Sequence, residues 1–291
     1  MEMEKKKQRT GVINELDYKQ FHGKVLYWVL FIAMIIIAFI AMAPPVWVML
    51  SSVKDIKEFY QIPPTLLPHS FDFSKIAKAW QTLDFTSYYA NTFIITAGTI
   101  VVRVVFNGLA GYAMSKLKPK GWKVVFGLAL GSMMIPSQVS MIPVYLNIVN
   151  MKMLNSFLPL ILMAGFNAFS AIIFKSFFDG IPSTLVEAAQ IDGCSAIGIF
   201  FKIMVPLSKP VIATIAIMAF TSAWGDFLMP LLVLKDTKLQ TIMLAVYTLN
   251  GELPQDQVMV ILTFAIIPPA IIFIIFQKNI MHGVTMSGIK G

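Results

Sequence analysis

Residues 25–50 form an apolar run of 26 positions without one Asp, Glu, Lys or Arg. As an α-helix this run would extend about 39 Å, which exceeds the roughly 30 Å hydrocarbon core of a bilayer. Ala41-Met42-Ala43 resembles a signal-peptide cleavage site, but the apolar core of a signal peptide has only about 7–15 residues. The length of the run therefore favours an uncleaved first membrane span.

Five further apolar runs follow the first one, at residues 88–115, 124–149, 154–178, 210–234 and 258–276. Backbone polar groups cannot stay unpaired in lipid, so runs of this length are expected to be helices. The short alternating segments of a membrane β-barrel do not occur. The sequence therefore predicts an all-α, polytopic protein with six transmembrane helices, and an ordered loop at residues 51–87 between the first two.

The composition excludes several classes of protein. Only 13% of the residues are charged and 57% are hydrophobic, whereas soluble domains carry about 25% charged residues. A soluble enzyme and a disordered chain are therefore excluded, and the single cysteine, Cys194, excludes a disulfide scaffold. His22, His69 and His282 lie in different segments, so we expect no metal site, and no catalytic motif is found.

The net charge of +8 indicates the orientation in the membrane. If successive loops alternate between the two sides of the membrane, 15 Lys and Arg residues lie on the side that holds both termini, and seven lie on the other side. Cytoplasmic loops carry the excess of Lys and Arg. We therefore expect cytoplasmic tails at residues 1–24 and 283–291 and an external loop at 51–87. The positive charge then faces lipid head groups and cytoplasmic partners, and it gives no reason to expect a nucleic acid.

The cytoplasmic connection at residues 179–209 is too long and too regular for a plain loop. Thr184 and Glu187 have the spacing of a capping box, which would open a short helix, and Gly193 lies where a C-terminal glycine would end it. A second amphipathic stretch follows, and Pro206 and Pro210 separate it from the next span. The pattern predicts helix, glycine turn and helix. An amphipathic hairpin lying on the bilayer would also fit it.

This connection resembles the EAA motif of ABC-importer permeases. The residues that carry the resemblance, and that would couple the spans to an ATPase, are Glu187, Ala188, Ala189, Asp192, Gly193, Ile203 and Pro206. The one departure is Val205, where the family usually has Leu. The stretches 224–231 and 277–291 are similar to the carbohydrate-uptake branch, and in particular to its smaller maltose-type permease. The resemblance covers about residues 85–291, which makes 88–282 the permease core.

The resemblance implies the permease of a type I importer in a bacterial or archaeal cell membrane. A second permease chain would complete the pore, two ATPase subunits would use ATP and Mg, and an external binding protein would deliver a sugar or oligosaccharide. This chain would then bind no cofactor and catalyse no reaction. The tail residues Gly288, Lys290 and Gly291 would contact the ATPase. The alternatives are another cargo, such as a polyamine or phosphate, and a secondary transporter.

Two formal charges, Arg103 and Asp226, lie well inside the apolar runs. A charge that faces lipid is costly, so each should face protein or water. Their depths in the membrane differ by roughly 12 Å, so we expect no direct salt bridge between them. Asp226 would accept a hydrogen bond either from a sugar hydroxyl near the pore or from a neighbouring helix in a structural role. The further candidates for the pore are Tyr89, Asn91, Asn167, Trp224 and Phe227, and Gly127 with Gly131 predicts close helix packing.

Overall fold

The structure is a computed structural model that describes residues 21–63 and 65–287. Every regular element within these ranges is a helix, and no strand occurs in them. The all-α prediction is therefore confirmed for the part of the chain that the structure describes.

Three helical stretches are long and apolar enough to cross a membrane without a break. They are α2 (Phe21–Ser51), α4 (Phe85–Tyr112) continued by the π-helical turn η2 (Ala113–Leu117), and α15 (Gln255–Ser287). These stretches match the expected spans at 25–50, 88–115 and 258–276, because uniform apolar sequence over this length favours one continuous helix.

Three further candidate spans are sharply bent pairs of helices. The first pair, α5 (Trp122–Ser132) and α6 (Ser137–Asn150), turns by 107°. The second, α8 (Ala168–Asp179) and α9 (Ser183–Ile191), turns by 80°. The third turns by 87° and joins α12 (Lys209–Trp224) to a stretch made of α10 (Ala196–Ile199), the π-helical turn η3 (Phe200–Met204) and α11 (Val205–Leu207). The described residues thus contain three to six helical spans, by length and composition.

The remaining apolar runs are not single helices. Run 124–149 breaks before Pro136, run 154–178 consists of α7 (Leu158–Leu162) and α8, and run 210–234 consists of α12 and α13 (Leu228–Val233). The other short helices are η1 (Ile56–Tyr60), α3 (Ser74–Thr82), η4 (Thr237–Leu239) and α14 (Ile242–Leu249). The break at residues 133–135 is itself apolar, so hydrophobicity alone did not reveal it.

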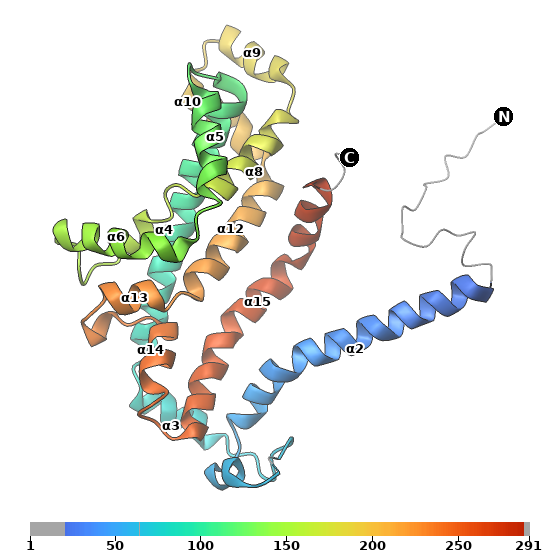
Figure 1. Ribbon diagram of the computed structural model, residues 1–291, viewed down its shortest axis with the longest axis vertical. Helices are drawn as coiled ribbons and strands as arrows, with labels where there is room; N and C mark the ends of the chain where they lie inside the picture. The colour runs from blue at the N-terminus through green and yellow to red at the C-terminus, as the bar shows by residue number, and fades with distance from the viewer. Residues whose placement is uncertain (1–20, 64, 288–291) are drawn as a thin grey trace.

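Helix α4 runs through the middle of the bundle (Figure 1). It packs against α8 and α12, and α12 packs in turn against α15. The crossing of α4 and α8 is close: a Cβ added to Gly111 would lie 2.6 Å from Phe174 Cβ and 2.8 Å from the Lys175 backbone nitrogen. Glycine is therefore required at this crossing.

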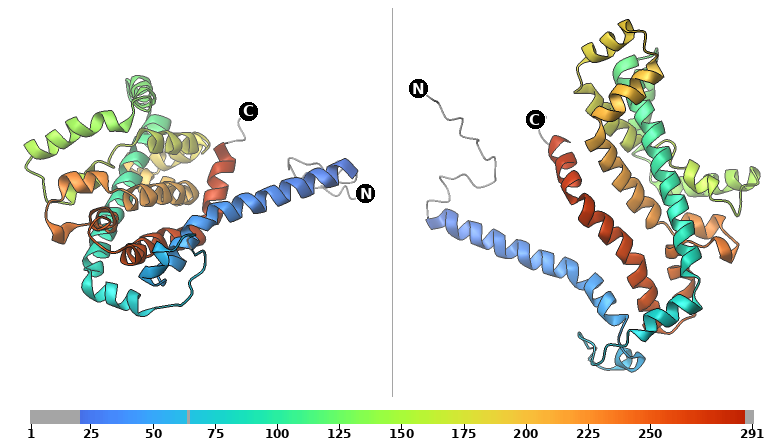
Figure 2. Two further views of the ribbon diagram at one scale, coloured as in Figure 1. Left: turned by 60° about the horizontal axis from the view of Figure 1, so that its bottom comes forward. Right: turned by 180° about the vertical axis from the view of Figure 1, so that it is seen from behind.

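Helix α2 diverges from the bundle and meets α15 only towards its C-terminal end (Figure 2). No residue in the most apolar stretch of α2 is buried, and the Phe39 side chain is 78% exposed. The first span therefore has most of its surface uncovered by this chain.

The segment that follows α2 is held by polar contacts. The Lys54 ammonium donates to the Thr65 carbonyl, and the buried Glu58 carboxylate accepts from the Thr65 hydroxyl at 3.0 Å. Lys75 forms a 2.6 Å ion pair with Asp256 at the beginning of α15. These contacts tie the 51–83 segment to the last helix, and they agree with the expectation of an ordered loop.

Candidate functional site

The connection between α8 and α12 lies at one end of the molecule, with α9 at the tip (Figure 1). The 80° and 87° bends turn α9 and the α10–α11 stretch across the directions of α8 and α12. The structure therefore contains the expected helix, turn and helix within 179–209.

The turn between α9 and α10 is a Schellman motif at Gly193. The Gly193 N–H donates to the Gln190 carbonyl at 3.0 Å, and the Cys194 N–H donates to the Ala189 carbonyl at 2.9 Å. Gly193 has φ = +78°, a conformation that favours glycine. The predicted C-terminal glycine is confirmed in this position.

The predicted capping box at the start of α9 is wrong. The helix begins at Ser183, and Pro182 is the residue before its first turn, with no capping hydrogen bond from a side chain. A capping box needs Ser or Thr in that position, but Thr184 already lies inside the helix. The proline sets the start of the helix because its backbone is fixed near the required φ.

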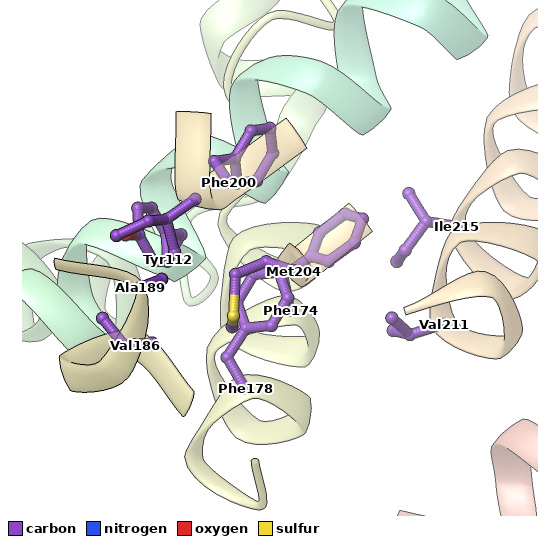
Figure 3. Packing of buried hydrophobic residues seen from close by; sticks show 10 residues of the cluster. Tyr112, Phe174, Phe178, Val186, Ala189, Phe200, Met204, Val211 and Ile215 are labelled. Carbon is purple, nitrogen blue, oxygen red and sulfur yellow. The ribbon is translucent and has the colours of Figure 1, made fainter. Parts of the chain in front are cut away.

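A buried cluster of ten apolar residues joins the tip to the bundle (Figure 3). Helix α9 contributes Val186 and Ala189, η3 contributes Phe200 and Met204, and the remaining members come from α4, α8, α10 and α12: Tyr112, Phe174, Phe178, Ile199, Val211 and Ile215. A displacement of α9 would therefore be transmitted to α8 and α12 through direct packing.

Most of the predicted coupling residues lie on the outside of this cluster. Glu187, Ala188, Asp192, Gly193 and Pro206 are exposed, Ile203 is half-buried, and Ala189 is buried. Ala189 is therefore part of the buried cluster, whereas the exposed coupling residues are accessible to another molecule.

The same surface exposes large apolar side chains. Ile191 is 87% exposed, and the others are Leu185, Ile197, Phe201 and Leu207. Contiguous apolar surface beside charged residues is typical of a protein docking site. The arrangement can therefore bind a partner protein and pass its movement to the spans.

Two π-helical turns, η2 and η3, lie at the base of the tip. In η2 the Lys118 N–H donates to the Ala113 carbonyl, five residues back, at 2.8 Å, and η3 ends with the same bond between Val205 and Phe200. The rings of Tyr112 and Phe200, next to these turns, lie 5.7 Å apart. Such turns occur frequently at functional sites.

A polar cluster that the sequence analysis missed fixes the bend between α8 and α9. The Asp179 carboxylate accepts from the Ser115 hydroxyl and from the Lys175 ammonium, both at 2.7 Å, and Lys116 donates to the Ile181 carbonyl. Ser115, Lys116, Asp179 and Ile181 border a polar hollow of about 370 Å³. The i, i+4 spacing of Lys175 and Asp179 was the available signal.

The candidate pore residues are engaged within the chain. The Tyr89 hydroxyl donates to the Phe264 carbonyl at 2.7 Å, the Asn91 amide to the Lys238 and Gln240 carbonyls, and the Trp224 indole N–H to the Ala265 carbonyl at 3.0 Å. Each side chain thus fastens two helical segments together.

The other pore candidates lie at breaks between helices. Asn167 accepts from the Ser170 N–H at 2.9 Å at the start of α8, and Asp226 accepts from the Leu228 and Met229 N–H groups at the start of α13. Phe227 stacks on Tyr247 with ring centroids 4.9 Å apart. Asp226 therefore caps the helix that directly follows it, and these bonds are not the expected hydrogen bond to a neighbouring helix.

Three further predictions concern the pair Arg103 and Asp226, a metal site, and the C-terminal tail. No ion pair joins Arg103 and Asp226, in agreement with their expected separation. In the described part of the chain, no group of His, Cys, Asp and Glu residues is suited to a metal ion. Gly288, Lys290 and Gly291 lie outside the described residues.

The chain is similar over most of its length to permeases of known transport systems. It is 31% identical to the arabinooligosaccharides transport system permease protein AraQ of Halalkalibacterium halodurans, over 94% of this chain and 100% of that protein. It is 30% identical to the sulfoquinovosyl glycerol transport system permease protein SmoH of Agrobacterium fabrum, over 93% and 95% of the two chains.

The fold is also that of a solved transporter. A chain of a bacterial ABC transporter involved in the import of the acidic polysaccharide alginate matches with a TM-score of 0.78, at 24% identity, over 89% of this chain and 98% of that one. The family described as the binding-protein-dependent transport system inner membrane component matches residues 107–285. The chain therefore belongs to this family of multi-pass membrane permeases of ABC importers.

Proposed function

We propose that this chain is a saccharide permease that docks on an ATPase subunit through α9 and the α10–α11 stretch. The observation that carries the proposal is the tip itself, where Glu187, Asp192 and exposed apolar side chains surround a rigid glycine turn. ATP and Mg would be used by the partner ATPase, and this chain would bind no cofactor.

The packing below the tip supports this assignment. Val186 and Ala189 of α9 belong to the same buried cluster as Phe178 of α8 and Met204 of η3, so movement of α9 is expected to disturb both elements. Closure of the ATPase pair would then displace the tip and reorient the two spans that begin at its bends. A membrane-surface hairpin would need no such rigid connection.

The test is a charge reversal at the tip in the complete transporter. Glu187→Lys is expected to lower ATP-dependent uptake and the ATPase subunit recovered with the permease by at least about tenfold, because it places a cation in the docking surface. Glu252→Lys, at an exposed carboxylate outside the tip, is the matched control. Normal uptake and normal ATPase recovery with Glu187→Lys would disprove the docking assignment.

The orientation proposed from the Lys and Arg distribution places the tip and both termini in the cytoplasm. The polar cluster around Asp179 supports this orientation, because three lysines, Lys116, Lys118 and Lys175, lie at the bend that leads into α9. A thiol reagent that does not cross membranes should label Cys194 in inside-out vesicles and spare it in intact cells. The reverse pattern would overturn the orientation.

A second permease chain is proposed to cover the surface that α2 and α5 leave open. A Cβ added to Gly127 or Gly131 would meet no atom within 4 Å, so the close packing expected there has no partner among the described residues. Phe39→Asp is expected to reduce recovery of the second permease in pull-down experiments. Full transport by this chain and the ATPase alone would contradict the proposal.

The proposed cargo is a sugar or oligosaccharide, supplied by an external binding protein. The named relatives support this class, since one transports arabinooligosaccharides and another sulfoquinovosyl glycerol. Uptake of a panel of radiolabelled saccharides, polyamines and phosphate into proteoliposomes would test it. Uptake driven by a proton gradient without ATP would instead favour a secondary transporter.

A further inference from the structure

Arg103 lies near the middle of the helical stretch Phe85–Leu117, the longest of the uninterrupted candidate spans. A guanidinium stays charged at any physiological pH, and at this depth it cannot face lipid without a large cost. Its side chain is half-buried. The exposed part of the guanidinium must therefore face water or another polar group.

No described residue satisfies this side chain. The buried Nε atom has no hydrogen-bond partner, and the guanidinium forms no hydrogen bond or ion pair with any residue that the structure describes. Asp226, the other charge inside the apolar runs, is engaged with two backbone N–H groups at the start of α13. The guanidinium therefore has no counter-charge within the described part of the chain.

The backbone around Arg103 is held in place by two asparagines. The Asn107 amide donates to the Arg103 carbonyl at 2.7 Å, and the Asn107 side-chain oxygen accepts from the Asn167 N–H at 2.7 Å. Asn167 in turn caps α8. Arg103 is therefore fixed one turn before the level at which α8 begins.

Other polar features occupy the same region. The buried Thr96 hydroxyl has no partner in the described chain and lies seven residues before Arg103, which places both on one face of α4. Residues 163–167 between α7 and α8 are not helical. Irregular backbone at membrane depth is tolerated only within protein or beside a water-filled cavity.

We propose that Arg103 is a cargo-binding residue on the translocation path and that its guanidinium pairs with a carboxylate of an acidic saccharide. Asn107 and Asn167 are positioning residues that hold α4 at this level. A guanidinium matches a carboxylate in two parallel hydrogen bonds, which a lysine cannot reproduce. This inference rests on the proposed function as a saccharide permease.

The test compares acidic and neutral probes in the complete transporter, reconstituted with its binding protein and with ATP. The probes are trigalacturonate and the corresponding neutral galactotriose. Arg103→Gln is expected to lower trigalacturonate uptake at least about tenfold and galactotriose uptake much less. Arg103→Lys should retain part of the acidic uptake. Lys78→Gln, at an exposed cation outside the spans, should change neither.

Two transport results would overturn the inference and leave the proposed function intact. One is a wild-type transporter that imports galactotriose and rejects trigalacturonate. The other is an equal loss of both probes in Arg103→Gln, with or without loss of the second permease, which would assign Arg103 to gating or to a contact between permease chains. A wild-type transporter that imports no saccharide with ATP would remove the proposed function as well.

A second measurement tests whether water reaches Arg103. The chain has one cysteine, so Arg103→Cys in a Cys194→Ser background carries a single thiol, and Cys194→Ser is its reference. A sulfonate-bearing methanethiosulfonate should modify this thiol if water reaches position 103. No modification in any state of the ATP cycle would show that Arg103 is not on the aqueous path.

Discussion

At the tip of the molecule, α9 is held by side chains such as Phe178, Phe200 and Met204, which are at most 3% exposed. At the other end, the segment after α2 is held by Lys54, Glu58 and the Lys75–Asp256 pair. The first connection is apolar and interdigitated, whereas the second combines apolar packing at Ala79 and Trp80 with hydrogen bonds and an ion pair.

The difference indicates what each end has to do. Apolar packing transmits displacement because close-packed side chains have little freedom to slide. Polar contacts between a loop and α15 fix a position but leave α2 free to be covered by another chain. The tip is therefore suited to transmit motion, and the α2 end is suited to assemble with a partner.

The largest effect is expected from removal of an aromatic ring at the tip. Phe174 is 1% exposed, so Phe174→Ala should lower the free energy of unfolding by about 3–5 kcal/mol. Thermal unfolding of the purified permease in detergent measures it. Phe39→Ala, at the exposed ring in α2, is the control and should leave this chain's stability within about 0.5 kcal/mol. Similar losses for both variants would remove the contrast between the two ends.

A smaller effect is expected at the polar end. Lys75→Met breaks the ion pair with Asp256, and a hydrogen bond between charged groups contributes about 1.5–3 kcal/mol. Hydrogen exchange should increase in residues 54–83 and remain unchanged at α9. Faster exchange at α9 as well would mean that the two ends unfold as one unit.

The polar end should also depend on pH. Burial raises the pKa of the Glu58 carboxyl, but hydrogen bonds from the His69 N–H and the Thr65 hydroxyl outweigh it and leave the pKa below its ordinary value. A lowered pKa stabilises the fold above the ordinary value, and this contribution is lost as the pH falls through the lowered pKa.

Protease cleavage of the 51–73 segment should therefore increase at acidic pH in the wild type. Glu58→Gln should be cleaved faster at neutral pH, with little further change on acidification. Acid-dependent cleavage that persists in Glu58→Gln would assign the effect to another group.

The smallest predicted effect is an increase in stability from a substitution at the tip. The Tyr112 hydroxyl is buried and has no hydrogen-bond partner among the described residues. Tyr112→Phe removes this unsatisfied group and should stabilise the permease by about 1 kcal/mol in the same thermal unfolding measurement. A loss of stability would show that the hydroxyl has a partner in the assembled protein, and the apolar description of the tip would need revision.

Much of this architecture could be predicted because apolar length alone encodes a membrane helix. The runs at 25–50, 88–115 and 258–276 correspond to α2, α4 and α15. Gly193 was predictable for a different reason, since few residues other than glycine adopt a positive φ at the end of a helix.

The breaks in the other spans could not be predicted in this way. Residues 133–135 are Met, Met and Ile, so the sequence stays apolar where α5 ends and the chain turns by 107°. Tertiary packing decides such positions. The polar cluster around Asp179 was missed for a related reason, because Ser115 lies 64 residues from Asp179 in the sequence. The start of α9 was wrong because Pro182 determines it more strongly than Thr184.

The two π-helical turns at the base of the tip have a consequence for the history of the chain. A π turn holds one residue more than an α turn of similar rise, so η2 and η3 correspond to single-residue insertions into ordinary helices. Deleting one residue from 113–117 would restore a regular helix and rotate everything after it by about 100°, which would carry Lys116 away from Ile181.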